Sequence, residues 1–189
     1  MSTITTYNPA TEEKLATYKM HTDDEVIDII NDCHEAYATQ KSSTFSERAI
    51  LMNRAAEILE ERKEKYAQAM TEEMGKTYSS AIAEVEKCAW VCRYYADNAE
   101  EFLKDEIIET DAHKSLISYR PIGIVLAVMP WNYPFWQVFR FAAPALMAGN
   151  VGILKHASNV PKCALQIEEV FRDAGFPKNA FRTLLIGSS

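Results

Sequence analysis

Three apolar runs separated by two helical segments span residues 119–187, and this pattern constrains the fold more than any other feature. The runs Ile122–Met129 and Val151–Leu154 have the continuous apolar character of buried parallel strands. The first stops at Pro130-Trp131-Asn132-Tyr133-Pro134 and the second at Lys155-His156-Ala157-Ser158. Ligands of open parallel α/β sheets bind at the carboxyl ends of the strands. We therefore expect the functional site at this edge.

The same region predicts the rest of a βαβαβ unit. A helix is expected from about Pro134 to Gly149, with a kink at Pro144 because proline removes a helical hydrogen bond. A second helix should begin near Pro161, since proline is favoured in the first helical turn, and a third strand should cover Phe181–Ile186.

The residues before the sheet predict a helical part. Thr-x-x-Glu pairs at 22–25 and 44–47 have capping-box spacing, and each opens an amphipathic helical pattern. The second pattern should run as one helix to Met74, and a third helix should cover residues 79–103. Residues 1–20 are expected to be extended.

The fold class is therefore α/β, with N-terminal helices followed by the βαβαβ half of a Rossmann-like parallel sheet. The expected parts are a helical part (residues 1–105), a bridging strand segment (106–120) and the sheet (121–189). In the bridging segment, alternation of polar and apolar residues over Leu116–Arg120 predicts a half-exposed strand.

Composition excludes several classes of protein. The net charge of −7 and pI near 5.2 argue against nucleic acid or an anionic membrane as the partner. We see no signal peptide and no apolar run of the ~18 residues that a spanning helix needs, so a cytoplasmic location is expected.

The four cysteines, Cys33, Cys88, Cys92 and Cys163, have no zinc-ligand spacing, so we expect no metal site. Cys163 lies near a helix start, where the dipole can lower a thiol pKa. Nothing near it in sequence resembles a base or an oxyanion loop, so a structural role is expected for all four.

A Gly-x-Gly-x-x-Gly fingerprint is absent after the first strand. The motifs that are present resemble the aldehyde dehydrogenase superfamily over essentially the whole chain. They are Asn8-Pro9-Ala10-Thr11, Glu73-Met74-Gly75-Lys76, Tyr-Arg-Pro-Ile-Gly-Ile-Val (119–125), Met-Pro-Trp-Asn-Tyr-Pro (129–134), Pro-Ala-Leu-Met-Ala-Gly-Asn-Val (144–151) and Leu-Lys-His-Ala-Ser (154–158). The last is most similar to a succinate-semialdehyde dehydrogenase subgroup.

The resemblance implies the N-terminal portion of an enzyme that oxidises an aldehyde, most closely succinate semialdehyde, to a carboxylate with NADP or NAD. Residues 121–189 would then be the first half of the NAD(P)-binding sheet, with the nucleophilic cysteine, the catalytic glutamate and the catalytic domain beyond Ser189. The chain alone is expected to be inactive, and its last strand to leave an unpaired edge and uncovered apolar surface. The expected partners are a small-molecule aldehyde and, at full length, copies of the same chain.

The resemblance gives Asn132 a catalytic role as the amide that donates to the oxyanion. An uncharged donor stabilises developing negative charge without pairing beforehand with a thiolate, and one such donor contributes ~10²–10³ in rate. The alternative is an asparagine that only caps a turn. Its position at the carboxyl end of a strand favours catalysis.

The resemblance also implies a cofactor site. Lys155 matches a lysine that contacts the adenosine ribose, although a lysine that extends to solvent is the alternative. Ser158 stands where NAD-preferring members often carry glutamate, which repels a 2′-phosphate, so NADP should be tolerated or preferred. The implied cofactor-binding residues are Met129, Pro130, Trp131, Asn132, Lys155, His156, Ala157 and Ser158.

Substrate residues are expected on the helix after Asn132. Tyr133, Gln137 and Arg140 are spaced i, i+4 and i+7 and share one face, which in the family lines the aldehyde tunnel. Arg140 matches an arginine that binds the distal carboxylate, a task suited to the bidentate guanidinium group. The alternative is an ordinary surface arginine. Two other hypotheses stay open: an aldehyde dehydrogenase of other specificity, and a short non-catalytic protein for nucleotide binding or assembly.

Overall fold

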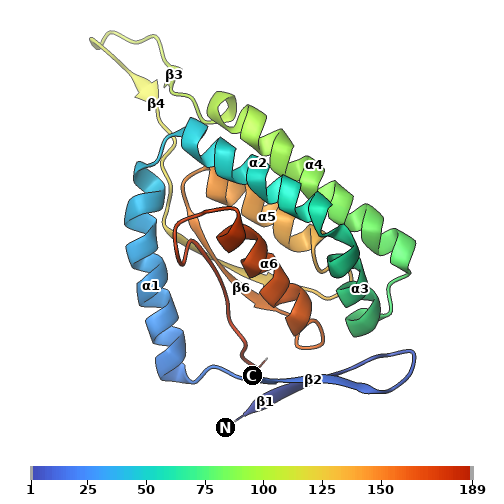
Figure 1. The fold of residues 1–189 in the computed structure, drawn as a ribbon. Helices are drawn as coiled ribbons and strands as arrows, with labels where there is room; N and C mark the ends of the chain where they lie inside the picture. The colour runs from blue at the N-terminus through green and yellow to red at the C-terminus, as the bar shows by residue number, and fades with distance from the viewer. Residues whose placement is uncertain (1, 188–189) are drawn as a thin grey trace.

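The computed structural model describes residues 2–187, which form helices packed on a small parallel sheet, with two separate strand pairs (Figure 1). The elements are β1 (Thr3–Tyr7), β2 (Lys14–Lys19), α1 (Asp23–Ser42), α2 (Phe45–Glu61), α3 (Lys63–Met74), α4 (Tyr78–Phe102), β3 (Glu106–Ile107), β4 (Leu116–Ile117), β5 (Ile124–Met129), α5 (Trp136–Met147), β6 (Val151–His156), α6 (Pro161–Asp173) and β7 (Phe181–Thr183).

The main sheet has the strand order β5-β6-β7 with all strands parallel, which confirms the predicted βαβαβ unit. Gly152 of β6 faces α5, because a Cβ atom there would lie 2.8 Å from Phe181 and 3.7 Å from Phe141. Arg182, the next residue of β7, faces the other side, where it lies 3.8 Å from Asp32 of α1. The helix α1 therefore covers one face of the sheet, and α5 and α6 cover the other.

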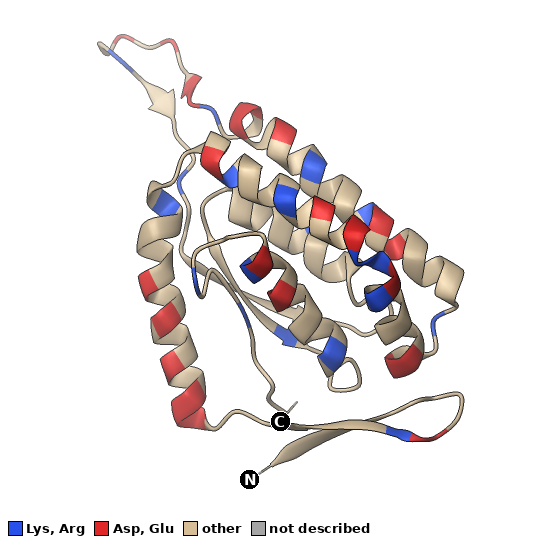
Figure 2. Ribbon diagram, in the orientation of Figure 1, with Lys and Arg blue, Asp and Glu red and all other residues tan. Residues whose placement is uncertain are grey.

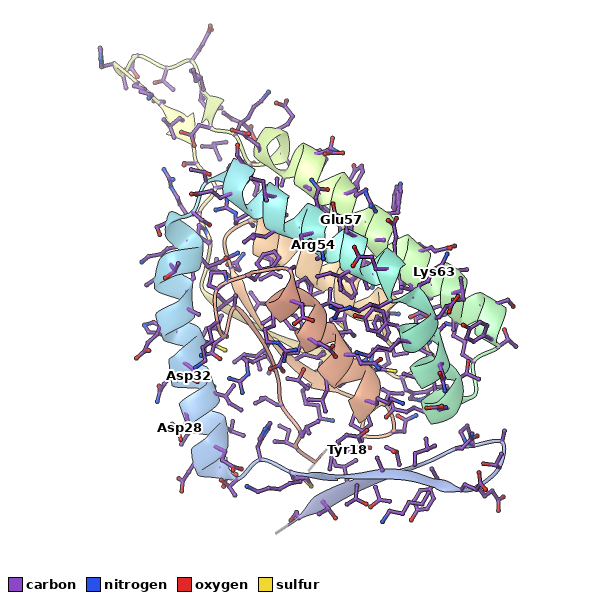
Figure 3. The ribbon with its side chains drawn as sticks, in the orientation of Figure 1. Tyr18, Asp28, Asp32, Arg54, Glu57 and Lys63 are labelled. Carbon is purple, nitrogen blue, oxygen red and sulfur yellow. The ribbon has the colours of Figure 1, made fainter. Side chains whose placement is uncertain are left out.

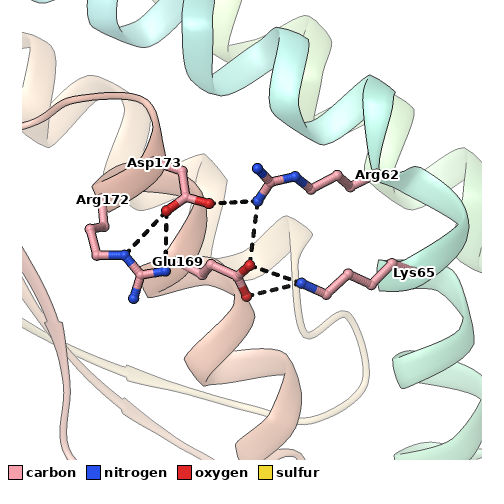
Figure 4. A network of polar contacts seen from close by, with 5 residues as sticks. All are labelled: Arg62, Lys65, Glu169, Arg172 and Asp173. Carbon is pink, nitrogen blue, oxygen red and sulfur yellow. Dashed lines mark hydrogen bonds and ion pairs between the residues drawn. The ribbon is translucent and has the colours of Figure 1, made fainter.

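Local capping contacts start the helices of the helical part, and distant ion pairs position them. Both capping boxes are present. The hydroxyl of Thr22 accepts from the backbone amide of Glu25, and that of Thr44 from the amide of Glu47. The second helical pattern is broken at Arg62, between α2 and α3, and is not one helix as predicted. Arg62 pairs with Asp173 at 2.6 Å and with Glu169 at 3.3 Å (Figure 4). The junction of α2 and α3 is thereby tied to α6.

Two predictions about exposed segments are wrong. The strand expected over Leu116–Arg120 has only two residues, which pair with Glu106–Ile107 in an arm that projects from the body (Figure 1). The uncovered apolar surface expected on the last strand lies instead on β5, where Leu126 and Val128 are 60% and 67% exposed. The cause is that α1 leaves the carboxyl half of this face open among the described residues.

Charged side chains lie on the outer faces of the helices (Figure 2). Figure 2 shows acidic residues along α1, and Figure 3 shows Arg54 and Glu57 on α2, which form an ion pair of 2.8 Å. Exposed pairs of this kind contribute little to stability, so the fold rests on the buried helix and sheet faces. Between residues 2 and 187, no helix combines the length and the apolar character needed to cross a membrane.

Candidate functional site

The polar residues that follow the two strands lie at one edge of the sheet. β5 and β6 are paired so that Val128 lies beside Lys155 and Met129 beside His156, the last residues of the two strands. Asn132 follows β5 by three residues and is exposed in the loop before α5. The asparagine and the lysine therefore reach the same carboxyl edge from neighbouring strands.

Lys155 and His156 leave β6 on opposite faces, since side chains alternate along a strand. Lys155 is half-buried on the face that α1 covers only in part, beside the exposed Leu126 and Val128. An open apolar surface next to an ammonium group suits the base and ribose of a nucleotide. Of the other residues predicted to bind cofactor, Pro130, Trp131 and Ser158 are exposed, while Met129 and Ala157 are half-buried.

His156 makes contacts that the sequence did not predict. Its ring is buried against α5, with Nε2 3.0 Å from the carbonyl oxygen of Pro134 and Nδ1 accepting from the amide of Ala157 at 2.8 Å. This pattern assigns the proton to Nε2, and burial lowers the pKa of the imidazole. Nε2 thus donates to the Asn132 loop and holds it against β6, while Nδ1 accepts from the residue that directly follows β6. A cofactor contact by His156 stays a prediction.

A buried carboxylate caps the helix that begins after the Asn132 loop. Oε1 of Glu84, on α4, accepts from the backbone amides of Phe135 and Trp136, each at 2.9 Å. Its other oxygen pairs with Lys76, and the Lys76 ammonium lies 3.7 Å from the centroid of the Tyr133 ring. Lys76, the last residue of the Glu73-Met74-Gly75-Lys76 motif, and Glu84 therefore hold the Asn132 loop from outside the sheet.

The start of α6 is capped in the same way. Glu73 accepts from the amides of Lys162 at 2.8 Å and Cys163 at 3.0 Å, and burial raises the pKa of its carboxyl group. Helix N-termini often bind phosphate, but these two are occupied by carboxylates of the chain itself. Burial, with the nearby Glu73, also raises the pKa of the Cys163 thiol, so the helix dipole does not activate it.

Buried side chains of α1 and α2 also hold the far end of α5. The side chain of Gln40 donates to the carbonyl of Leu146, and Nε of Arg48 donates to that of Met147, both at 2.9 Å. These bonds satisfy carbonyl groups that a helix end leaves without partners. The helix that carries the predicted substrate residues is therefore fixed at both ends.

The predicted substrate residues differ in exposure. Tyr133 and Arg140 are exposed and Gln137 is half-buried. Tyr133 lies in the loop before α5, so a face shared by all three residues stays a prediction. Trp136 was not predicted, yet with Tyr133 it lines a cavity of about 370 Å³ at the start of α5. In residues 2–187, no group of three or more His, Cys, Asp or Glu side chains could hold a metal ion.

The arrangement offers a neutral amide, a cation and an apolar surface at one sheet edge, on a Rossmann-like α/β fold. The chain belongs to the aldehyde dehydrogenase family, since the model of the Aldehyde dehydrogenase family matches residues 1–189. A relative from Synechocystis, named a probable NADP(+) succinate-semialdehyde dehydrogenase, is 57% identical over 97% of this chain and 40% of its own length. An NADP(+) succinate-semialdehyde dehydrogenase of Mycobacterium leprae is 51% identical over 98% of this chain and 41% of its own length.

Solved structures agree with the sequence relatives. The succinic semialdehyde dehydrogenase of Streptococcus pyogenes with NADP+ superposes with a TM-score of 0.93 at 36% identity, covering 98% of this chain and 41% of that one. The structure of Gox0499, from work on its cofactor and substrate selection, superposes with a TM-score of 0.95 at 35% identity. It covers 100% of this chain and 41% of the Gox0499 chain. The chain spans about two fifths of the length of these relatives.

Proposed function

We propose that the chain provides the cofactor sheet and the oxyanion donor of an NADP-linked aldehyde dehydrogenase that oxidises succinate semialdehyde to succinate. The observation that carries the proposal is the meeting of Asn132 and Lys155 at one carboxyl edge of β5 and β6. The names of the relatives support both the cofactor and the substrate.

The residues present fit the cofactor. Lys155 would donate hydrogen bonds to the ribose hydroxyls, and Leu126 and Val128 would give the nucleotide an apolar surface. Ser158 is exposed and uncharged, so it does not repel the 2′-phosphate of NADP. When bound, NADP supplies the hydride acceptor. NAD would make the same contacts except those to the 2′-phosphate, which it lacks.

Asn132 would donate from its side-chain amide to the aldehyde oxygen as negative charge develops there. The loop would keep its position through His156 and through the Lys76 and Glu84 contacts. All four cysteines are buried, and burial raises the pKa of each thiol. We propose that the nucleophile and the general base come from protein outside these 189 residues.

Two variants of the protein expressed from its complete reading frame test the proposal. Asn132→Ala should lower kcat by ~10²–10³ and leave the Kd for NADP nearly unchanged. Lys155→Ala should raise that Kd and affect kcat less. A wild-type protein that binds NADP but oxidises no aldehyde would support the non-catalytic alternative. Oxidation of neutral aldehydes with no advantage for succinate semialdehyde would instead support an aldehyde dehydrogenase of other specificity.

A further inference from the structure

A lysine of α4 lies over the substrate face of α5. The ammonium group of Lys87 is 4.0 Å from the centroid of the Trp136 ring. Lys87, Trp136 and Tyr133 line the cavity of about 370 Å³ described above, which adjoins the Asn132 loop. A positive charge is thus held on an aromatic ring at the mouth of the predicted substrate region.

The acidic neighbours of Lys87 are engaged elsewhere. Glu84, one turn earlier on α4, caps α5 and pairs with Lys76. Glu86 pairs with Lys63 of α3 at 2.6 Å. The charged groups that line the cavity are therefore two lysines and a single carboxylate, which leaves a net positive charge facing the opening.

Helical spacing brings Arg140 to the same ring. Trp136 and Arg140 are four residues apart on α5, so their side chains are neighbours on one face. Lys87 and Arg140 consequently flank Trp136, one from α4 and the other from α5. Arg140 is exposed. Two cations next to an apolar ring suit a short molecule with a carboxylate at one end and an apolar chain.

We propose that Lys87 is a second specificity-determining residue, which together with Arg140 selects aldehydes that carry a distal carboxylate. The proposal rests on the proposed aldehyde oxidation and extends it to a residue on another helix. Lys87 attracts the carboxylate to the cavity, and Trp136 keeps the ammonium group facing the opening.

The test compares succinate semialdehyde with butanal, a neutral aldehyde of equal chain length, in the protein from its complete reading frame. Lys87→Met keeps an apolar stem against Trp136 but removes the charge. The ratio of kcat/KM for succinate semialdehyde to that for butanal should fall about 3- to 10-fold, mainly through KM. Added salt should shrink the difference between wild type and variant, because it screens exposed charges. Lys87→Arg should restore most of the ratio.

Lys178→Met is the matched control, since it removes an equal charge from the exposed α6–β7 loop at the opposite edge of the sheet. The control should keep the wild-type ratio. The proposal is overturned, with the proposed function intact, if Lys87→Met keeps this ratio or lowers kcat for both aldehydes equally. A wild-type protein that oxidises neither aldehyde would overturn both.

Discussion

Replacing Glu84 by alanine should destabilise the protein far more than removing a surface charge. The Glu84 side chain is 2% exposed and joins three parts of the molecule. It caps the start of α5 through two amides at 2.9 Å and pairs with Lys76, whose side chain is 10% exposed. Glu84→Ala would leave both amides without their acceptor and a largely buried ammonium group without its partner.

The magnitude follows from these contacts. Loss of a helix cap costs about 0.5–2 kcal/mol, and removal of one member of a buried ion pair costs about 3–5 kcal/mol. The two effects overlap because a single carboxylate makes both contacts. The free energy of unfolding should therefore fall by about 3–5 kcal/mol. Glu84→Gln keeps an acceptor oxygen for the amides and should lose about 1–3 kcal/mol.

Urea unfolding followed by tryptophan fluorescence measures the effect. With a slope of about 2 kcal/mol per molar urea, the midpoint should fall by about 1.5–2.5 M in Glu84→Ala. Glu86→Ala is the matched control, because Glu86 lies on the same helix and its pair with Lys63 is exposed. The control should lose less than about 1 kcal/mol. Equal midpoints for the two alanine variants would refute the view that Glu84 holds α5 in place.

Three further predictions concern the cofactor, the sheet and pH. Ser158→Glu should weaken NADP binding roughly 10- to 100-fold by like-charge repulsion and affect NAD less; equal effects in titrations would contradict the assigned phosphate position. Gly152→Ala should cost about 1–3 kcal/mol in urea unfolding, since its Cβ would lie 2.8 Å from Phe181; an unchanged midpoint would contradict this. Burial lowers the pKa of His156, so its contribution to stability is present above the unfolded pKa of about 6.5 and is lost as pH falls below it. His156→Gln should therefore lose less stability than wild type from pH 7 to 5, and equal losses would refute the buried neutral ring.

The helix starts could be predicted because a capping box is a local signal: Thr22 and Thr44 each bond within their own first turn. The break between α2 and α3 could not, because Arg62 is held by side chains more than 100 residues away on α6. The length of the strand near Ile117 was overestimated for a related reason. Alternation shows that a segment can form a strand, but the extent of the strand depends on a partner.

The sheet edge of the site could be predicted because polar residues end each apolar run. The residues that fix the site were missed, although a signal was present. Glu84 falls among Ala81, Val85 and Cys88 on the buried face of α4, where an acid must have a partner. Strand alternation also predicts that the side chains of Lys155 and His156 lie on opposite faces of the sheet. The partners themselves, on α5 and its loop, could be found only from the structure.

We propose that one edge of the β5–β6 pair presents both Lys155 and Asn132 to a bound nucleotide and its substrate. A crystal structure of the complete protein with NADP tests it most directly. We expect a ribose hydroxyl within hydrogen-bonding distance of the Lys155 ammonium group, with the Asn132 amide facing the nicotinamide end. NADP bound away from this edge, with Lys155 in solvent, would refute this arrangement.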